Sequence, residues 1–326
     1  MHDVKKGTVA VLGSGSWGTA LALLLSKNGC QVRLWGPEAQ SILNAGENHP
    51  YHPGIPLLEH MQVCVDLEAA ILGADAVLLA VPSVAFTDVV AQVKATGHTR
   101  SLAWATKGLD HTNAQLLSDA LLAEWPEVAA MAVLSGPSFA AEVVAEKPSA
   151  INVGSNDQDY GRFWCDCLAN DYFHAQYTDD IVGVQVGGAV KNVIAIAAGM
   201  VDGLGYGANA RCALITQGLA EMRALGVALG ANPDTFSDLA GIGDLMLTAT
   251  DDQSRNRRFG LALGGGASLD AAESDIGQVV EGKVTAVSVQ GLAKKHGAAM
   301  PMLEQLMPIL TGESVLDQLP SDWFLP

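Results

Sequence analysis

The sequence predicts an α/β domain at residues 1–180 followed by an all-helical domain at residues 181–326. In the first half, short apolar runs alternate with helical stretches, which is typical of a mostly parallel sheet with right-handed crossovers. A glycine-rich turn directly follows the first of these runs. The second half contains no convincing strand pattern, and its apolar residues recur at helical spacing.

The expected strands of the first half end at residues that interrupt extended structure. Thr8–Leu12 ends in glycines, and Asp75–Val81 is stopped by Pro82. The other expected elements are strands at Gln31–Trp35, Ser101–Ala105, Ala130–Leu134 and Ala150–Val153, and helices at Thr19–Lys27 and Val84–Val93.

The second half begins with a long apolar helical stripe. Its members are Val186, Val190, Val193, Ile194, Ala197, Met200 and Val201. Further helices are expected at Ala210–Leu229 and Lys283–His296, and the run Gly264–Gly266 is expected to end a helix.

The composition and net charge of the chain limit the binding partners and the cellular compartment that we expect. The 326 residues are 49% hydrophobic and carry a net charge of -17, which argues against nucleic acid and against an anionic membrane surface. No uninterrupted apolar run reaches ~18 residues, and the N-terminal apolar stretch is too short for a signal peptide. The five cysteines are scattered, and the pair Cys165 and Cys167 lacks a second ligand pair. We therefore expect free thiols, no metal site, no integral membrane association and a cytoplasmic location.

The glycine turn has the pattern Gly13-x-Gly15-x-x-Gly18, between the first expected strand and the first expected helix. The first glycine permits the tight turn, the second lets a pyrophosphate approach the backbone, and the third lets helix pack on strand. The helix N-terminus then offers free N–H groups to the phosphates. This context favours a Rossmann-type dinucleotide site over an ordinary glycine-rich turn.

The end of the second expected strand leaves the choice between NAD and NADP open. No carboxylate stands at the strand tip itself, although Glu38 is close. No arginine beyond the tip is available to bind a 2′-phosphate.

Lys191 lies in the middle of the long helix, away from the apolar stripe. Its neighbours one and two turns away are Gly187, Gly188, Ala195 and Ala198, which leave space beside the amine. A lysine with apolar surroundings near another cation has a lowered pKa and can exchange a proton with a substrate hydroxyl. The alternative is a lysine whose aliphatic stem reaches the surface.

Three of the eight arginines, Arg255, Arg257 and Arg258, directly follow Ser254, an expected helix N-cap. Cations in a first helical turn oppose the helix dipole, so their placement favours an incoming anion such as a phosphate. The alternative is a surface cluster that pairs with the acidic pair Asp251–Asp252.

With these features assembled, the sequence resembles the bacterial NAD(P)-dependent sn-glycerol-3-phosphate dehydrogenase family over essentially its whole length. Six ordered blocks spread across both halves are more specific than any single motif. They are GSGSWGTALA (13–22), ATKGL (105–109), LSGPSFAAEV (134–143), the long run from Gly187 to Met222, AGIGDLMLTATDDQSRNRRFG (240–260) and VVEG (279–282).

The resemblance implies a 6-phosphogluconate dehydrogenase-like helical domain and a role for each matching residue. Lys191 would be the proton acceptor, Lys107 would contact both cofactor and substrate and steady the alkoxide, and Asp244 would orient Lys191. The implied substrate contacts are Lys107, Gly136, Ser138, Lys191, Asp244, Ser254, Arg255 and Asn256. The implied cofactor contacts, besides the three glycines, are Ser16, Trp17, Lys107, Ala140, Arg255, Val279 and Glu281.

Two departures from the family pattern stand near the glycine turn. Pro37 replaces a basic residue, which leaves NAD and NADP both open, and His52 replaces a leucine. His49 and His52 have HxxH spacing without a third ligand, so no metal site is expected.

The alternatives are a related β-hydroxyacid or 6-phosphogluconate-type dehydrogenase and a non-catalytic dinucleotide sensor. The residues Lys107, Lys191 and Asp244 favour an enzyme, and the arginine cluster favours a small phosphorylated substrate. The oligomeric state is open, with a homodimer as one option.

Overall fold

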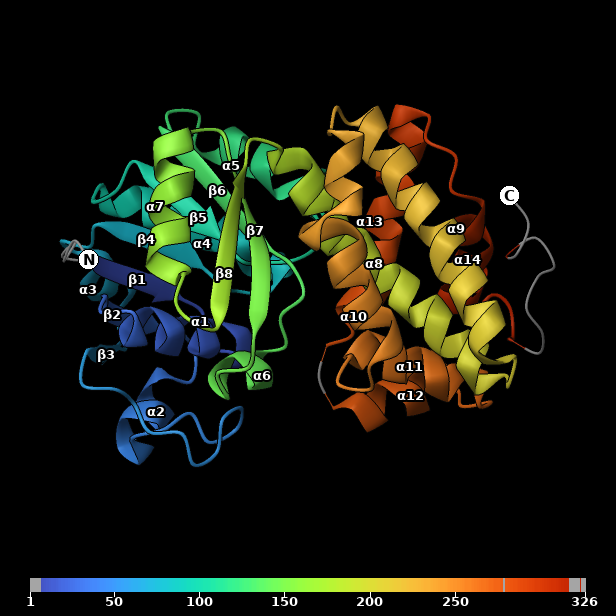
Figure 1. The fold of residues 1–326 in the computed structure, drawn as a ribbon, viewed down its shortest axis with the longest axis horizontal. Helices are drawn as coiled ribbons and strands as arrows, with labels where there is room; N and C mark the ends of the chain where they lie inside the picture. Colours follow the sequence, from blue (N-terminus) through green and yellow to red (C-terminus); the bar gives the residue numbers. More distant parts are fainter. Residues whose placement is uncertain (1–6, 278, 317–322, 324–326) are drawn as a thin grey trace. The chain divides into compact units, whose positions relative to one another are not determined.

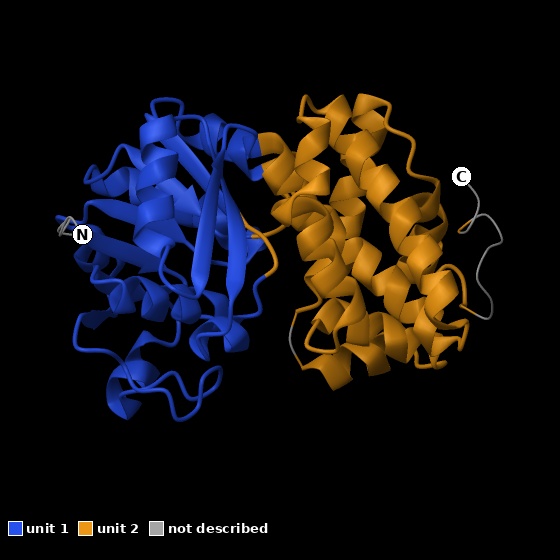
Figure 2. Ribbon diagram, in the orientation of Figure 1, with its two compact units in different colours: residues 1–106, 117–134, 138–181 blue, residues 107–116, 135–137, 182–326 orange. Residues whose placement is uncertain are grey.

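The computed structural model describes residues 7–277, 279–316 and 323, and these form two compact units (Figure 2). Unit 1 comprises Met1–Thr106, Leu117–Leu134 and Ser138–Ile181. Unit 2 comprises Lys107–Leu116, Ser135–Pro137 and Val182–Pro326. The two short segments of unit 2 lie far before residue 181, where the sequence alone put the start of the second domain.

Unit 1 contains an eight-stranded sheet with the order β3-β2-β1-β4-β5-β6-β7-β8 (Figure 1). The chain builds outward from β1 through β2 to β3, then returns to the other side of β1 for β4. Such a reversal creates a crevice at the carboxyl ends of the strands, where ligands of open α/β sheets bind. The strands are β1 (Thr8–Leu12), β2 (Gln31–Trp35), β3 (Met61–Cys64), β4 (Ala76–Leu79), β5 (Ser101–Trp104), β6 (Ala130–Ser135), β7 (Ser149–Ser155) and β8 (Phe173–Thr178).

Two groups of helices flank this sheet, with contacts within each group: α1, α6 and α7, and α3, α4 and α5 (Figure 1). Side chains of α1, α6 and α7 and of the strands form one hydrophobic core cluster. The helices are α1 (Ser16–Lys27), α2 (Ala39–Ala45), α3 (Leu67–Ile71), the 3-10 turn η1 (Ser83–Ala85), α4 (Phe86–Thr96), α5 (Leu117–Glu124), α6 (Ala140–Val144) and α7 (Gln158–Leu168).

The six predicted strands and two predicted helices of this half are confirmed, with ends shifted by up to three residues. The sequence reading missed β3 and β8. Strand β3 has only four residues, and β8 lies at the sheet edge, where His174 and Gln176 interrupt its apolar pattern.

From Ile181 onward the described residues form helices joined by short turns, without a strand, as the sequence predicts. The predicted helices at 210–229 and 283–296 are confirmed, and a helix does end at the 264–266 glycines. The elements are α8 (Ile181–Gly203), α9 (Gly207–Ala228), η2 (Pro233–Ser237), η3 (Leu239–Gly243), α10 (Asp244–Thr250), α11 (Arg255–Gly264), α12 (Leu269–Ile276), α13 (Glu281–His296) and α14 (Pro301–Thr311).

The predicted apolar stripe of α8 is buried as expected, but the helix is buried on every side from Gly183 to Val201, so the expectation of open space on its glycine and alanine face is wrong. The reason is close packing by several neighbours of unit 2. Gly199 touches the backbone of α11, and Gly218 of α9 packs on Ile194. A helix that is apolar all round is a core helix. Helix α8 is long and apolar enough to cross a membrane, but 89% of its most apolar window is buried inside the protein.

Candidate active site

The glycine turn of unit 1 has the geometry of a nucleotide-binding loop. Gly13 has a φ of 128°, and a Cβ there would meet the backbone of Ala80, the residue that follows β4. A Cβ at Gly18 would overlap the carbonyl oxygen of Gly13, so α1 packs directly on the turn. Gly15 differs, because a Cβ there would meet nothing within 4 Å. The three glycines thus serve a tight turn, an open approach and close helix packing.

The loop that follows α2 is tied to the same turn. The Nδ2 of Asn48 donates to the carbonyl of Ser14 at 2.7 Å, and a ring nitrogen of His52 contacts the carbonyl of Ser16 at 2.8 Å. The indole N–H of Trp17 and the Oδ1 of Asn48 are buried without a protein partner. His52 therefore stabilises the glycine turn through this contact. Among the described residues, no group of three His, Cys, Asp or Glu side chains is arranged to hold a metal ion.

A second site, within unit 2, is built around one buried carboxylate. Asp244 Oδ1 accepts a hydrogen bond from Lys191 Nζ at 2.6 Å, and Oδ2 accepts one from Lys107 Nζ at 2.7 Å. The side chains of Asp244, Lys191 and Lys107 are 1%, 7% and 16% exposed. The structure thus brings together the three residues predicted to be catalytic, although 137 positions separate Lys107 from Asp244.

Glycines of α8 make this arrangement possible. A Cβ at Gly187 would overlap the carbonyl of Ala240, so the turn before α10 lies directly on α8 and presents Asp244 to Lys191. A Cβ at Gly188 would crowd the hydroxyl of Ser135 and approach the stem of Lys107. The small residues beside Lys191 therefore admit the protein's own backbone and side chains, where the sequence reading expected open space.

Burial and neighbouring charge shift the pKa values of the pair in the same direction. Burial lowers the pKa of Lys191 from 10.5 to about 7; the Asp244 carboxylate opposes this change, and the Lys107 ammonium adds to it. Burial raises the pKa of Asp244, but Lys107 and Lys191 together lower it by more, so the net shift is downward. Asp244 therefore stays ionised, while Lys191 can lose its proton near neutral pH.

Two residues that sequence reasoning missed complete the cluster. Thr248 accepts a hydrogen bond from Lys191 Nζ at 2.9 Å and donates to the backbone carbonyl of Asp244 at 2.6 Å. Ser135, at the end of β6, donates to Asp244 Oδ2 at 3.4 Å. The i, i+4 spacing of Asp244 and Thr248 on α10 was a usable signal for the threonine. No local pattern marked Ser135.

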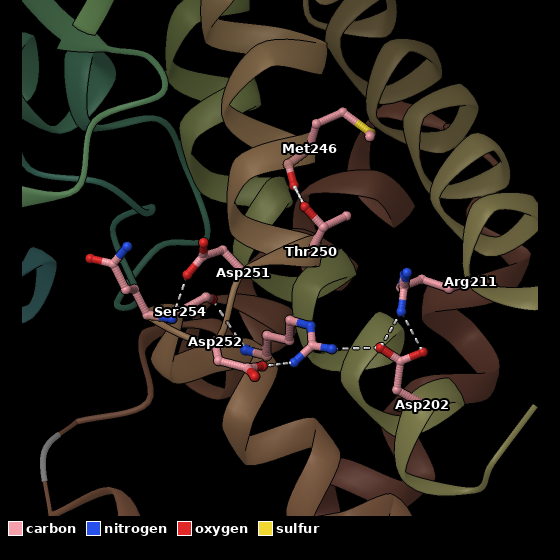
Figure 3. A network of polar contacts seen from close by, with 9 residues as sticks. Asp202, Arg211, Met246, Thr250, Asp251, Asp252 and Ser254 are labelled. Carbon is pink, nitrogen blue, oxygen red and sulfur yellow. Dashed lines mark hydrogen bonds and ion pairs between the residues drawn. The ribbon is translucent and has the colours of Figure 1, made fainter. Parts of the chain in front are cut away.

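The three arginines of the cluster have different surroundings, and Figure 3 shows Asp202, Arg211 and Asp252, which form ion pairs in this region. Arg257 pairs with Asp252 and, at 2.6 Å, with Asp202, which also binds Arg211 through both oxygens at 2.7 and 2.8 Å. The prediction that all three arginines of the cluster bind an anionic ligand is therefore wrong for Arg257, whose charge is neutralised by Asp202 and Asp252. Arg255 is partly exposed and Arg258 is exposed on the same helix.

The other predicted residues of this turn have structural partners. Ser254 caps α11 by accepting from the Arg257 N–H at 3.2 Å, as predicted. Asn256 Oδ1 accepts from the Gly282 N–H at 2.9 Å, so its amide NH2 is the donor left for a ligand. A Cβ at Gly282 would crowd the carbonyl of Asn192, next to Lys191 in α8. Asn256 is therefore held near the middle of α8, where Lys191 lies.

The predicted site residues fall into two sets. Unit 2 holds Lys107, Gly136, Lys191, Asp244, Ser254, Arg255, Asn256, Val279 and Glu281. Unit 1 holds Gly13, Gly15, Ser16, Trp17, Gly18, Ser138 and Ala140. The contacts described above assemble a nucleotide-type turn within unit 1 and, separately, a Lys–Asp–Lys cluster within unit 2.

Comparisons with known proteins agree with these two parts. Residues 8–161 match the N-terminal family profile of NAD-dependent glycerol-3-phosphate dehydrogenase, and residues 180–321 match its C-terminal profile. Proteins named glycerol-3-phosphate dehydrogenase [NAD(P)+] are similar throughout. That of Halorhodospira halophila is 47% identical, covering 95% of this chain and 94% of its own, and that of Methylococcus capsulatus is 49% identical, covering 93% and 92%. The crystal structure of the Coxiella burnetii glycerol-3-phosphate dehydrogenase has a TM-score of 0.91 at 42% identity, covering 95% and 96%.

Proposed function

The chain belongs to the family of NAD-dependent glycerol-3-phosphate dehydrogenases, and from this premise we propose how its residues interconvert dihydroxyacetone phosphate and sn-glycerol 3-phosphate. The observation that carries the proposal is the buried Asp244 that binds both Lys191 and Lys107. The glycerol 3-phosphate formed would supply phospholipid synthesis.

The glycine turn fits a dinucleotide, NAD or NADP. The open approach to Gly15 suits a pyrophosphate lying over the N-terminus of α1. Gly13, Gly15, Ser16, Trp17 and Gly18 would hold the cofactor there. Lys107, Ala140, Arg255, Val279 and Glu281 are further contacts that the resemblance implies. A nicotinamide dinucleotide held by these residues would supply the hydride chemistry, with its oxidised form as the acceptor for the C2 hydrogen of glycerol 3-phosphate.

Lys191 takes the hydroxyl proton in the oxidative direction and returns it in the reductive one. Its lowered pKa makes the neutral amine available near physiological pH. Asp244 and Thr248 fix the position of its Nζ through two hydrogen bonds. Lys107, held by the other oxygen of Asp244, keeps a cation beside the developing alkoxide.

The phosphate of the substrate is anchored by Arg255 and by the amide NH2 of Asn256, at the N-terminal turn of α11. A charged donor and an amide donor suit a phosphate dianion. Gly136, Ser138 and Ser254 are further substrate contacts implied by the resemblance. This anchor favours a small phosphorylated substrate over the hydroxyacids of more distant dehydrogenases.

Replacing Arg255 with alanine should raise the KM for dihydroxyacetone phosphate by about 10- to 150-fold, because it removes a charge-assisted contact worth about 1.5–3 kcal/mol. The KM for the cofactor should rise less. The measurement is NAD(P)H oxidation at varied substrate, with unphosphorylated dihydroxyacetone as the comparison.

Arg258→Ala is the matched control, because it removes an exposed arginine from the same helix. Its KM should match that of the parent enzyme. If substrate binding survives both Arg255→Ala and Asn256→Ala unaltered, the phosphate site lies elsewhere. If no turnover occurs with either cofactor, the proposed reaction itself fails.

The rate of glycerol 3-phosphate oxidation should rise with pH through the neutral range, and the rate of the reverse reduction should fall. The pKa of Lys191 is lowered to about 7, so the neutral amine needed for oxidation forms above that pH and the ammonium needed for reduction is lost there. We would measure kcat/KM in both directions from about pH 6 to about pH 9. Flat profiles over this range would contradict the assignment of Lys191.

We also propose a cytoplasmic location. The described cysteines are free thiols, and the net charge of -17 disfavours an anionic membrane surface. A homodimer stays a prediction, which sedimentation analysis of the purified enzyme can test.

A further inference from the structure

The tip of β2 lies beside the glycine turn. The backbone N–H of Gly13 donates to the carbonyl of Trp35 at 2.7 Å, and Leu12 pairs with Trp35 in the sheet register. In folds of this type the adenosine ribose of the dinucleotide lies at the end of the second strand. The side chains that follow Trp35 therefore determine whether the site binds a ribose with a 2′-hydroxyl or one with a 2′-phosphate.

Glu38 is fixed at this place by a buried serine. The hydroxyl of Ser14 donates to Glu38 Oε2, and the backbone N–H of Glu38 donates to the same hydroxyl oxygen at 3.3 Å. Ser14 is fully buried, and Gly36 lets it lie close, because a Cβ at Gly36 would overlap its hydroxyl. Since Ser14 uses Oε2, the other carboxylate oxygen is the one left to accept a hydrogen bond from a ribose hydroxyl.

Positive side chains that would bind a 2′-phosphate are missing from the surrounding sequence. From Leu34 to Val93 the chain has no lysine and no arginine. Arg33, just before this stretch, donates to the carbonyl of Leu72, and Lys27 pairs with Glu146 at 2.6 Å. A phosphate at the tip of β2 would therefore meet a carboxylate without a lysine or arginine from this stretch to offset the repulsion.

We propose that Glu38 makes this enzyme select NAD(H) over NADP(H). The proposal rests on the proposed use of a nicotinamide dinucleotide and names which of the two the site takes. Glu38 accepts a hydrogen bond from the ribose of NAD(H), and it repels the 2′-phosphate of NADP(H). Ser14 acts as the positioning residue that holds the carboxylate in place.

Binding of the adenosine half tests the proposal without turnover. AMP and adenosine 2′,5′-bisphosphate are compared by titration calorimetry, and NADH and NADPH by their fluorescence on binding. The parent enzyme should bind the two 2′-hydroxyl ligands at least ~10-fold more tightly than their 2′-phosphorylated partners. Glu38→Gln, which keeps an acceptor for Ser14 but removes the charge, should reduce this ratio by about 10-fold, mainly through tighter binding of the phosphorylated ligands.

Glu59→Gln is the matched control, since it makes the same charge change at an exposed position of unit 1. It should leave the ratio unchanged, which separates a local contact from the effect of net charge. Glu38→Arg should favour NADPH, an outcome that loss of folding cannot produce. Equal or tighter binding of NADPH by the parent enzyme, or an unchanged ratio in Glu38→Gln, would overturn the proposal. Turnover with NADH but failure of these binding tests would leave the proposed function intact.

Discussion

Lys191→Met is expected to lower kcat by at least ~100-fold while the enzyme stays folded and binds its cofactor normally. Removal of a general base typically costs ~10²–10⁴ in rate. Methionine keeps the length and apolar packing of the lysine stem within the core of α8. Asp244 keeps Lys107 as its counter-ion at 2.7 Å, so no uncompensated charge remains. Steady-state kinetics and cofactor titration measure both quantities.

A further variant of Lys191 and a control variant distinguish the loss of proton transfer from the loss of the positive charge. Lys191→Arg keeps a cation that does not lose its proton at accessible pH, so it should stay nearly inactive. Lys295→Met, an exposed position near the end of α13, is the control and should turn over normally. A folded Lys191→Met enzyme with near-normal kcat would remove Lys191 as the base, and Lys107 would be tested next.

Gly15→Leu is expected to weaken cofactor binding by at least ~100-fold, about 2.7 kcal/mol, without loss of fold. Space beside Gly15 is open in the protein, and its φ of -68° and ψ of -177° suit any residue. The new side chain would therefore meet no protein atom near its Cβ and would instead occupy the approach of the pyrophosphate. The Kd for NADH and the thermal unfolding midpoint are measured together.

The same position provides a graded control. Gly15→Ala adds only a Cβ, so its Kd should lie between those of the parent and Gly15→Leu, with all three unfolding at similar temperatures. Unchanged cofactor affinity in a folded Gly15→Leu variant would mean that the turn is not the dinucleotide site.

Local patterns predicted the elements that local physics determines. The order of strand, glycine turn and helix around Gly13 could be predicted from the sequence, because each of the three positions requires glycine for its own steric reason. The 23-residue helix α8 was legible from its apolar spacing. Strand β3 could not be predicted in this way, because it lies at the sheet edge and only two of its four residues are buried, whereas the equally short β4 and β5 are almost wholly buried.

Contacts between segments that are distant in the sequence could not be predicted from local sequence patterns. The glycines beside Lys191 drew attention to the right residue, but their partner proved to be the backbone of Ala240. Arg257 was read as part of an anion site because its partner Asp202 lies 55 positions away. Asp244 and Lys107 were predicted as site residues only because of the family resemblance, since nothing in their own segments indicates that their side chains are in contact.

The single carboxylate shared by Lys107 and Lys191 limits the order in which this cluster can mutate. A variant that first loses either lysine retains one neutral buried ion pair. A variant that first loses Asp244 leaves the Lys107 ammonium without its counter-ion and also loses the group that raises the pKa of Lys191, which is destabilising. Mutational paths away from this chemistry are therefore directional: each lysine is replaceable on its own, whereas the aspartate becomes replaceable only after a lysine has gone.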